Sequence, residues 1–259
     1  MRRLEQHKQA VGSPFVIKVA NLSHSYGDRQ ALSGLSFELF GGRLALLGVN
    51  GAGKSTLLRI LATALSPSSG EYSFQGRSTA STAGRRQLRS HLGWLPQAFG
   101  YEPSARLVTY LRYLAWLKGL PRAEIDAAVE SALTAVELGS RGSDRIRTLS
   151  GGMLRRLGIA QAILGDPKLL LLDEPTAGLD PVQRADLHQL IRAIPANRST
   201  IVSTHSIEDV EAVAEQVMII ASGYVQWFGS LQDLRDEAGA VALRDFVPAL
   251  MRTGGPANR

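Results

Sequence analysis

One nine-residue stretch, GVNGAGKST at Gly48–Thr56, most constrains how this chain folds. It follows the apolar run Leu44–Leu47 and precedes Leu57–Leu61, which has helical spacing. The pattern G-x-x-x-x-G-K-S between a strand and a helix is typical of a phosphate-binding loop. Its glycines let several N–H groups face one cavity, and the helix N-terminus adds positive potential. A purely structural glycine-rich turn is the alternative, and the two matching flanks disfavour it.

Within this loop, Lys54 and Ser55 have the residue types that phosphate chemistry needs. We expect Lys54 to reach the β- and γ-phosphates of a nucleotide and Ser55 to offer its hydroxyl to Mg²⁺. The purpose of the bound phosphates has to be inferred from the rest of the chain.

Composition narrows the class of protein. The 259 residues contain no cysteine, which excludes disulfides and Cys-ligated metal centres. No run approaches the roughly 18 apolar residues of a membrane span. The basic start, MRRLEQHKQAVGSP, leads into no apolar segment, so we expect no secretory signal and a cytosolic location. The net charge is +6, but the arginines are scattered, which favours a solvated basic surface over a nucleic-acid site.

The pattern of apolar residues predicts an α/β chain. We expect strands at 15–19, 33–39, 44–47, 71–74, 92–97, 168–172, 200–203, 216–221 and 224–228, with a turn at 23–30. Helices are expected at 54–65, 85–91, 150–164, 181–194 and 207–215. Residues 98–149 show helical spacing and no strand pattern, so they read as a helical insertion. Residues 1–13 read as a loose tail and 230–251 as a helical extension.

Two carboxylates, Asp173 and Glu174, follow the apolar run Leu169–Leu172. Such a run is typical of a buried parallel strand, and ligands bind at the carboxyl ends of these strands. We expect Asp173 to hold Mg²⁺ through its water shell and Glu174 to polarise a water for attack on the γ-phosphate. The alternative is two solvated carboxylates, which the phosphate-binding loop elsewhere in the chain disfavours.

The segment LSGGMLRR at Leu149–Arg156 forms a second anion-binding pattern. Ser150 can cap the helix that follows, and Gly151 and Gly152 leave its first N–H groups open. A purely structural helix cap is the alternative, and this segment alone does not decide between them.

Three further residues are candidates by position. His205 follows a strand end, where it can bond a γ-phosphate oxygen or orient the attacking water. Gln97 also follows a strand end and can reach Mg²⁺ or that water. Tyr26 can stack on adenine, or can be a turn tyrosine packed on the core. A lone histidine is more often structural, as we expect for His24, His91 and His188.

Taken together, these motifs resemble the ATP-binding subunit of an ABC transporter, over roughly residues 15–229. Tyr26 matches the A-loop aromatic, GVNGAGKST the Walker A motif, Gln97 the Q-loop and LSGGM the signature motif. LLLLDE matches Walker B, Ala177–Asp180 the D-loop and His205 the switch histidine. The resemblance implies ATP and Mg²⁺ as ligands, with ATP contacts at Tyr26, Asn50, Gly51, Ala52, Gly53, Lys54, Ser55 and Thr56.

The resemblance also implies a fold and a division of the chain. The fold is a P-loop NTPase (RecA-like) core with a parallel sheet, an antiparallel β subdomain and an inserted α-helical subdomain. One ABC ATPase domain covers 15–229, with the helical subdomain at about 98–160. Residues 1–14 form an N-terminal tail, and 230–259 form a short helical extension and tail.

The resemblance implies partners as well. ATP is hydrolysed by a head-to-tail dimer, in which each nucleotide lies between Walker A of one protomer and Ser150, Gly151 and Gly152 of the other. A homodimer is favoured over a heterodimer. Met153 stands where the general pattern has glutamine, and methionine followed by basic residues resembles ABC-2-type exporters. The expected partners are transmembrane permease subunits and not nucleic acid, with the chain peripheral on the cytoplasmic face of the cell membrane.

The sequence suggests where a permease would bind. The aromatic residues of the helical insertion, some of them core residues, are a hypothetical groove for a short permease helix. They are Phe99, Tyr101, Tyr110, Tyr113 and Trp116.

Two other classes of protein remain as alternatives. One is a soluble ABC-type ATPase of a non-transport assembly system. The long coiled-coil or cysteine–zinc insertions of DNA-repair members and the second cassette of translation factors are absent here, whereas a cofactor-assembly ATPase stays open. The other is a P-loop kinase for a small molecule, which the signature motif and the acidic pair Asp173–Glu174 disfavour.

Overall fold

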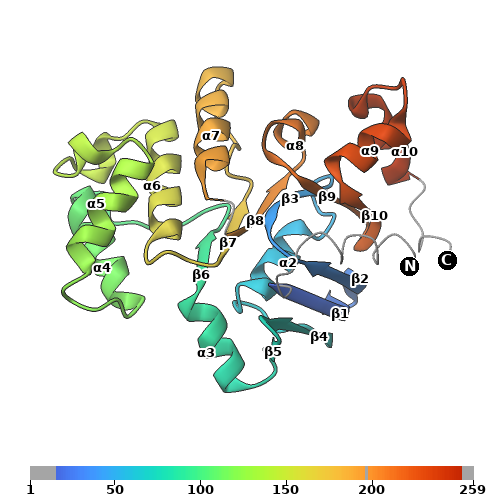
Figure 1. Cartoon of the computed structure of the whole chain (residues 1–259), viewed down its shortest axis with the longest axis horizontal. Coiled ribbons are helices and arrows are strands. Elements are labelled where there is room, and N and C mark those ends of the chain that lie inside the picture. The colour runs from blue at the N-terminus through green and yellow to red at the C-terminus, as the bar shows by residue number, and fades with distance from the viewer. Residues whose placement is uncertain (1–15, 196–197, 253–259) are drawn as a thin grey trace.

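The computed structural model describes residues 16–195 and 198–252. The tail predicted at residues 1–13 and the last residues of the C-terminal tail lie outside these ranges. The described chain contains two β-sheets with helices around them (Figure 1). No helix in the described ranges is both long enough and apolar enough to cross a membrane.

The larger sheet has six strands in the order β10-β9-β3-β8-β7-β6. Every neighbouring pair is parallel except the hairpin of β9 and β10. The carboxyl ends of the parallel strands therefore share one edge, which brings the ends of β3, β6, β7 and β8 together. The strands are β3 (Gly42–Leu47), β6 (Leu92–Leu95), β7 (Leu169–Asp173), β8 (Ser199–Thr204), β9 (Gln216–Ala221) and β10 (Tyr224–Ser230).

Both faces of this sheet are buried, which explains the continuous apolar run in β7. Leu169 and Leu171 belong to one core cluster, whereas Leu170 and Leu172 belong to another on the opposite face. All the residues of β7 are buried. This arrangement confirms the prediction of a parallel sheet covered on both faces.

The smaller sheet is antiparallel, with the order β2-β1-β4-β5. Its strands are β1 (Ile17–Tyr26), β2 (Arg29–Leu39), β4 (Ser69–Phe74) and β5 (Arg77–Ser78). The turn predicted at 23–30 is wrong in extent, because β1 continues to Tyr26 and pairs it with Arg29. Only Gly27 and Asp28 remain in the turn, and Gly27 takes the positive φ of +57° that a tight turn needs.

Helix α2 (Lys54–Leu61) joins the two sheets through one core. Its buried residues Leu57 and Leu61 share a cluster with Leu46 of β3 and Leu35 of β2. The helix is shorter than the predicted 54–65, since the chain turns at Thr63, whose φ of +58° is left-handed.

The helical insertion is confirmed. Residues 98–149 contain an isolated bridge between Arg106 and Arg145 but no strand. They form α4 (Leu107–Leu117), α5 (Ile125–Ala135) and the short 3₁₀ turns η1 (Gly139–Arg141) and η2 (Ile146–Thr148). These pack with α6 (Gly151–Ile163) at one end of the molecule (Figure 1).

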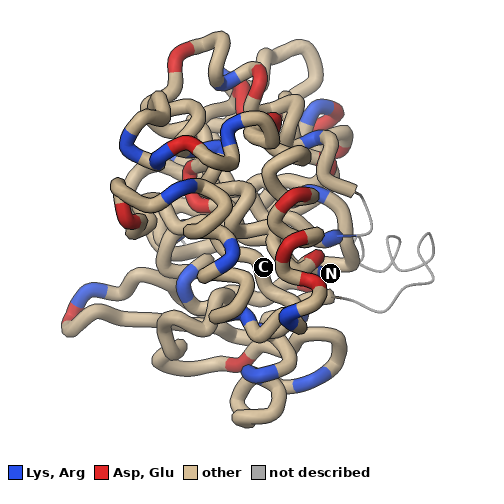
Figure 2. Tube along the Cα trace, turned by 90° about the vertical axis from the view of Figure 1, so that its left-hand side faces the viewer, with Lys and Arg blue, Asp and Glu red and all other residues tan. Residues whose placement is uncertain are grey.

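The remaining helices pack against the two sheets. They are α3 (Thr82–Ser90), α7 (Pro181–Ala193), α8 (Ile207–Val213), α9 (Leu231–Ala238) and α10 (Leu243–Arg252). The helix predicted over 230–251 is in fact two, because Gly239 breaks it with a φ of +61°. Figure 2 shows Lys and Arg interspersed with Asp and Glu along the trace, which agrees with a scattered basic surface.

Candidate active site

The loop Gly48–Thr56 leaves β3 and enters α2 between tightly packed backbones. A Cβ at Gly53 would lie 2.6 Å from the Ala31 carbonyl oxygen, and the φ of Gly53 is +110°. A Cβ at Gly48 would lie 2.5 Å from the Ile220 carbonyl oxygen. Glycine is therefore required at both positions because other backbone segments of the chain approach closely. At Gly53 the left-handed backbone conformation also requires it.

Lys54 places a buried cation at the N-terminus of α2. Its side chain is 4% exposed. Its ammonium group donates to the carbonyl oxygens of Gly48 at 2.7 Å and Val49 at 3.2 Å. It also lies 3.3 Å from Oε1 of Glu174, its ion-pair partner. A buried cation beside a helix N-terminus makes a strong site for an anion.

Asp173 ends β7 beside the loop and is buried. Its Oδ1 accepts hydrogen bonds from Ser55 Oγ at 3.2 Å and from Ser203 Oγ at 2.6 Å. The Ser203 hydroxyl in turn accepts the Glu174 backbone N–H at 2.9 Å. Ser203 thus links both carboxylate positions, a role that was not predicted for it. The sequence does not single it out, because Ser199, Thr200 and Thr204 of the same buried strand are polar as well.

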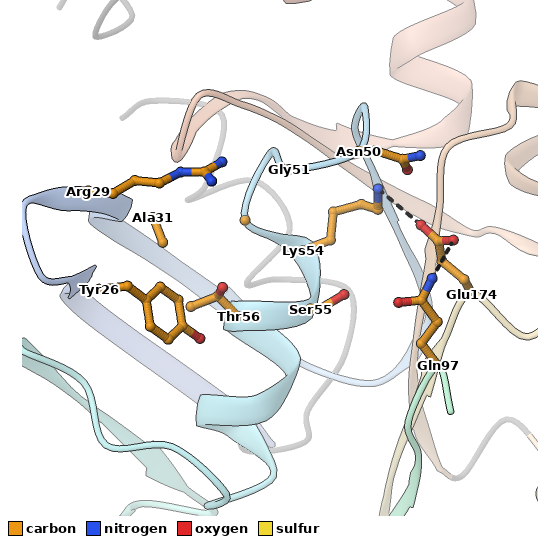
Figure 3. A pocket seen from close by; sticks show the side chains of 11 residues that line it. Tyr26, Arg29, Ala31, Asn50, Gly51, Lys54, Ser55, Thr56, Gln97 and Glu174 are labelled. Atoms are coloured by element: carbon orange, nitrogen blue, oxygen red, sulfur yellow. Dashed lines mark hydrogen bonds and ion pairs between the residues drawn. The ribbon is translucent and has the colours of Figure 1, made fainter. Parts of the chain in front are cut away.

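Glu174 is the centre of the site. Besides Lys54, its carboxylate accepts a long 3.5 Å hydrogen bond from Gln97 Nε2 and lies 3.7 Å from His205 Nδ1 (Figure 3 shows the Lys54 and Gln97 contacts). Its backbone φ of +46° is left-handed, a conformation that costs a non-glycine residue about 1–2 kcal/mol. The fold holds this residue in a strained conformation that brings its side chain to the other three.

A further cation, Arg155 of α6, supports the Gln97 segment from the side. Its Nη1 donates to the Gln97 carbonyl oxygen at 2.9 Å. Burial lowers the pKa of Arg155, and the charge of Glu174 acts in the opposite direction. The helix that begins at the LSGGM segment is therefore bonded to the residue that faces Glu174. No local sequence pattern indicates this link between Arg155 and Gln97.

Lys54, Glu174 and Gln97 line a cavity of about 430 Å³, whereas Asp173 and His205 are not among its lining residues (Figure 3). Tyr26, Arg29 and Ala31, from the β1–β2 hairpin, line one side, while Glu174 and Gln97 line the other. The loop lies between them, and the cavity is lined by its residues Asn50, Gly51, Gly53, Lys54, Ser55 and Thr56. Tyr26 is 44% exposed, and its ring meets the edge of His24 at 4.6 Å between centroids.

Two lining residues, Arg29 and Ala31, were not predicted. The signal for them was their short distance in sequence from Tyr26. Arg29 has no hydrogen bond or ion pair from its side chain to the rest of the described residues.

Other predicted residues lie away from this cavity. Ala52 belongs to the loop, but its side chain is buried and does not line the cavity. Ser150 caps α6 by accepting the Met153 N–H at 3.3 Å, and Asp180 caps α7 by accepting the Gln183 N–H at 2.9 Å.

The signature segment has a cavity of its own. Ser150 and Gly152 line a separate hollow of about 380 Å³ with Gln183 and residues of α7. Gly151 starts the same helix and is exposed. Within one chain, the structure therefore does not bring Ser150, Gly151 and Gly152 to the phosphate-binding loop.

The donor set suits Mg²⁺ held jointly with phosphate. No group of three or more His, Cys, Asp or Glu side chains in the described ranges could hold a metal ion alone. The Ser55 hydroxyl and the Asp173 carboxylate are nevertheless hydrogen-bonded to each other beside the buried Lys54. Oxygen ligands of this kind, completed by phosphate oxygens, are what Mg²⁺ takes in nucleotide sites. The residues present therefore fit the ion that the sequence predicts.

The sequence of this chain is similar to those of known proteins. Residues 32–177 match the family described as "ABC transporter". The chain is 35% identical over 224 residues to the uncharacterized ABC transporter ATP-binding protein YxlF of Bacillus subtilis, which covers 86% of this chain and 73% of that protein. The chain belongs to the ABC transporter family, as an ATP-binding domain.

Two further proteins extend this likeness. The chain is 36% identical over 214 residues to the Nod factor export ATP-binding protein I of Rhizobium meliloti, covering 80% of this chain and 62% of that one. The structure resembles cbiO1 from Clostridium perfringens, part of the ABC transporter complex cbiONQ, with a TM-score of 0.76, 30% identity and coverage of 87% and 92%. Some relatives are far longer: the chain spans 15% of the human cholesterol transporter ABCA5.

Proposed function

We propose that this chain hydrolyses ATP with Mg²⁺ and thereby powers transport, in the export direction, through separate permease subunits. The observation that carries the proposal is the convergence on one cavity edge of Lys54, Glu174, Gln97 and His205. Phosphate binding alone would not need a buried carboxylate facing a glutamine and a histidine. Hydrolysis does need such a group, because the attacking water must be oriented and deprotonated.

Each side chain then has a role in hydrolysis. Tyr26 stacks on adenine at the open side of the cavity, and the N–H groups of the loop and Lys54 bind the phosphates. Glu174 acts as the general base. Gln97, which lies beside Oε2 of Glu174, and His205, which lies beside Oε1, orient the water. When bound, Mg²⁺ neutralises phosphate charge, and Ser55 and Asp173 hold it, with Gln97 as a third ligand.

The ion pair between Lys54 and Glu174 links the binding of ATP to the state of the general base. A phosphate group in the cavity competes with Glu174 for the Lys54 ammonium. Once Lys54 turns to the phosphates, the carboxylate of Glu174 loses its ion-pair partner and is free to face the attacking water. Binding of ATP would therefore activate the base.

The second half of the nucleotide site is proposed to come from another copy of the chain. Ser150, Gly151 and Gly152, at the N-terminus of α6, and Asp180, at that of α7, lie outside the cavity. Helix N-termini with open N–H groups bind phosphate. A head-to-tail homodimer would bring this surface to the γ-phosphate of its partner, so that ATP closes the dimer and hydrolysis opens it.

The likeness to an export ATP-binding protein and to a subunit of a multi-protein transporter supports the permease partners. On this view the chain is peripheral to the cytoplasmic face of the membrane. The division into an ATPase domain at 15–229, a helical subdomain at about 98–160, and terminal segments at 1–14 and 230–259 belongs to the same proposal.

The burial of the aromatic residues supports a permease contact with fewer residues than the five named from the sequence. Tyr110 is a core residue: its hydroxyl donates to Gln161 at 2.7 Å, and burial raises its pKa to about 12. By contrast, Tyr113 and Trp116 are stacked at 6.1 Å and are 56% and 64% exposed. Phe99 is half-buried, and Tyr101 is exposed. We therefore place the contact on Tyr113 and Trp116, whose replacement by serine should abolish transport coupling but keep basal ATP hydrolysis.

The decisive experiment compares wild-type protein with Glu174→Gln. Wild type should release phosphate from MgATP, whereas Glu174→Gln should be slowed at least about 100-fold. The variant should also form an ATP-dependent dimer, seen by size-exclusion chromatography with light scattering. Unchanged hydrolysis without a trapped dimer would contradict the role of Glu174.

A second experiment separates the classes of protein. Purification from membranes with a polytopic protein would support a transporter subunit, whereas purification with soluble proteins alone would favour an assembly ATPase. Transfer of the γ-phosphate to a metabolite instead of water would favour a kinase.

A further inference from the structure

A buried carboxylate outside the cavity, Asp209 of α8, collects an unusual number of hydrogen bonds. Its Oδ1 accepts from Arg184 Nε at 2.7 Å and from His188 Nε2 at 2.6 Å. Its Oδ2 accepts from Thr176 Oγ1 at 2.8 Å and from Thr204 Oγ1 at 2.5 Å. The residue is 2% exposed. These donors come from three separate segments of the chain, and the proposed chemistry uses none of them.

Two of the donors, Thr204 and Thr176, lie next to residues of the proposed active site. Thr204 directly precedes His205, and its hydroxyl also accepts the Ser206 N–H at 3.0 Å, so that His205 is held on both sides. Thr176 lies two residues after Glu174. The Thr204 carbonyl oxygen also accepts the Gly48 N–H at 3.3 Å, at the start of the phosphate-binding loop.

The other two donors, Arg184 and His188, lie on α7. That helix begins directly after Asp180, its capping residue. A displacement of Asp180 would therefore move the Asp209 carboxylate through Arg184 and His188, and with it the loops that carry Glu174 and His205.

The charge of Asp209 is stabilised in this cluster. Burial by itself would raise the pKa of Asp209, but the hydrogen bonds from Arg184, Thr204, Thr176 and His188 together hold that pKa below its ordinary value. The carboxylate is therefore ionised at neutral pH and can accept from all these donors at once. Such a fully satisfied buried network is rigid.

We propose that Asp209 is a positioning residue for ATP hydrolysis, joining the segment after Glu174, the segment before His205 and helix α7 into one unit. The inference rests on the proposed function. In this unit, Asp209 lies outside the cavity lining and acts through Glu174 and His205. Asp209 also couples Asp180 to both residues. A displacement of Asp180 by a docked second copy would therefore shift Glu174 and His205.

The test uses full-length protein and the variants Asp209→Asn, Thr204→Val and Thr176→Val, which remove hydrogen bonds and keep side-chain size. We expect kcat for MgATP to fall about tenfold or more, as small misplacements of catalytic groups do. The dissociation constant for MgATP should change less than about twofold. Ser230→Ala, which removes the cap of the distant helix α9, is the matched control for general destabilisation and should keep kcat unchanged. All assays are run equally far below each unfolding midpoint.

A double-mutant cycle tests whether Thr204 affects kcat through His205. If Thr204 acts through His205, then Thr204→Val should lower kcat less than about twofold in a His205→Ala background. Full additivity of the Thr204→Val and His205→Ala effects on kcat would overturn the inference. So would an unchanged kcat in the folded cluster variants, or a loss of MgATP affinity as large as the loss of kcat. Should Asp209→Asn not fold, the two valine variants decide the question. Absence of hydrolysis by wild type would refute the proposed function itself, whereas active wild type with active cluster variants would refute only the role of Asp209.

Discussion

Ser203→Ala is the substitution whose effect follows most directly from the structure. The Ser203 hydroxyl is fully buried and donates to Asp173 Oδ1 at 2.6 Å while it accepts the Glu174 N–H at 2.9 Å. Its removal takes a hydrogen bond from a carboxylate, about 1.5–3 kcal/mol, and leaves a buried N–H unpaired, about 1–3 kcal/mol. Asp173 keeps its longer bond from Ser55, so we expect the free energy of unfolding to fall by about 3 kcal/mol.

The same strand supplies the control. Ser199 is also buried in β8, but its hydroxyl has no hydrogen-bond partner within the described ranges. Ser199→Ala therefore removes an unsatisfied polar group and should leave stability unchanged or raise it slightly. The two variants make the same chemical change on one strand. The expected difference in their free energy of unfolding therefore depends only on the hydrogen bonds that each serine makes.

Urea unfolding followed by circular dichroism measures the difference. We expect Ser203→Ala to unfold about 6–12 °C below wild type in a thermal scan as well, at about 2–4 °C per kcal/mol for a chain of this size. If the two serine variants lie within about 1 kcal/mol of each other, Ser203 does not bridge Asp173 and Glu174 as described. In that case, Ser203 does not hold Asp173 and Glu174 in place before nucleotide binds.

Three further outcomes follow from the site. Arg29→Gln should weaken MgATP binding about two- to fivefold at low salt, measured by titration calorimetry, with kcat retained and with the exposed Arg77→Gln as an unaffected control. Gly53→Ala should abolish nucleotide binding and lower stability by about 1–3 kcal/mol, since its Cβ meets the Ala31 carbonyl in a left-handed conformation; normal binding would contradict this. Because the folded-state pKa of Asp209 is lowered, its stabilisation is complete above its unfolded pKa of about 4 and is lost as the pH falls through the lower folded value. The difference in unfolding free energy between wild type and Asp209→Asn should therefore shrink below about pH 4, and a difference independent of pH would refute it.

Much of the site could be predicted from sequence because its residues stand at the ends of apolar runs. Parallel strands share their carboxyl edge, so Lys54, Asp173, Glu174 and His205 had to meet once the strands were recognised. The helical insertion was equally readable, since the spacing of its leucines differs from that of any strand.

The parts that could not be predicted depend on contacts between distant segments. The bonds of Ser203 to β7 and of Arg155 to Gln97 cross from one element to another, and no local pattern encodes them. Tyr110 and Tyr113 look alike in sequence, yet the packing of α4 buries one and exposes the other. The early end of α2 follows from one left-handed residue, Thr63, in a stretch of good helix formers.

The separation of the phosphate-binding loop from Ser150–Gly152 determines how defects in two copies would combine. If each nucleotide lies between the loop of one copy and the signature segment of the other, each copy contributes its Lys54 to one site and its Ser150 to the other site. Pairing Lys54→Ala with Ser150→Arg would place both defects in a single site and leave the second site intact. Mixed populations of two inactive variants should then regain activity that neither has alone.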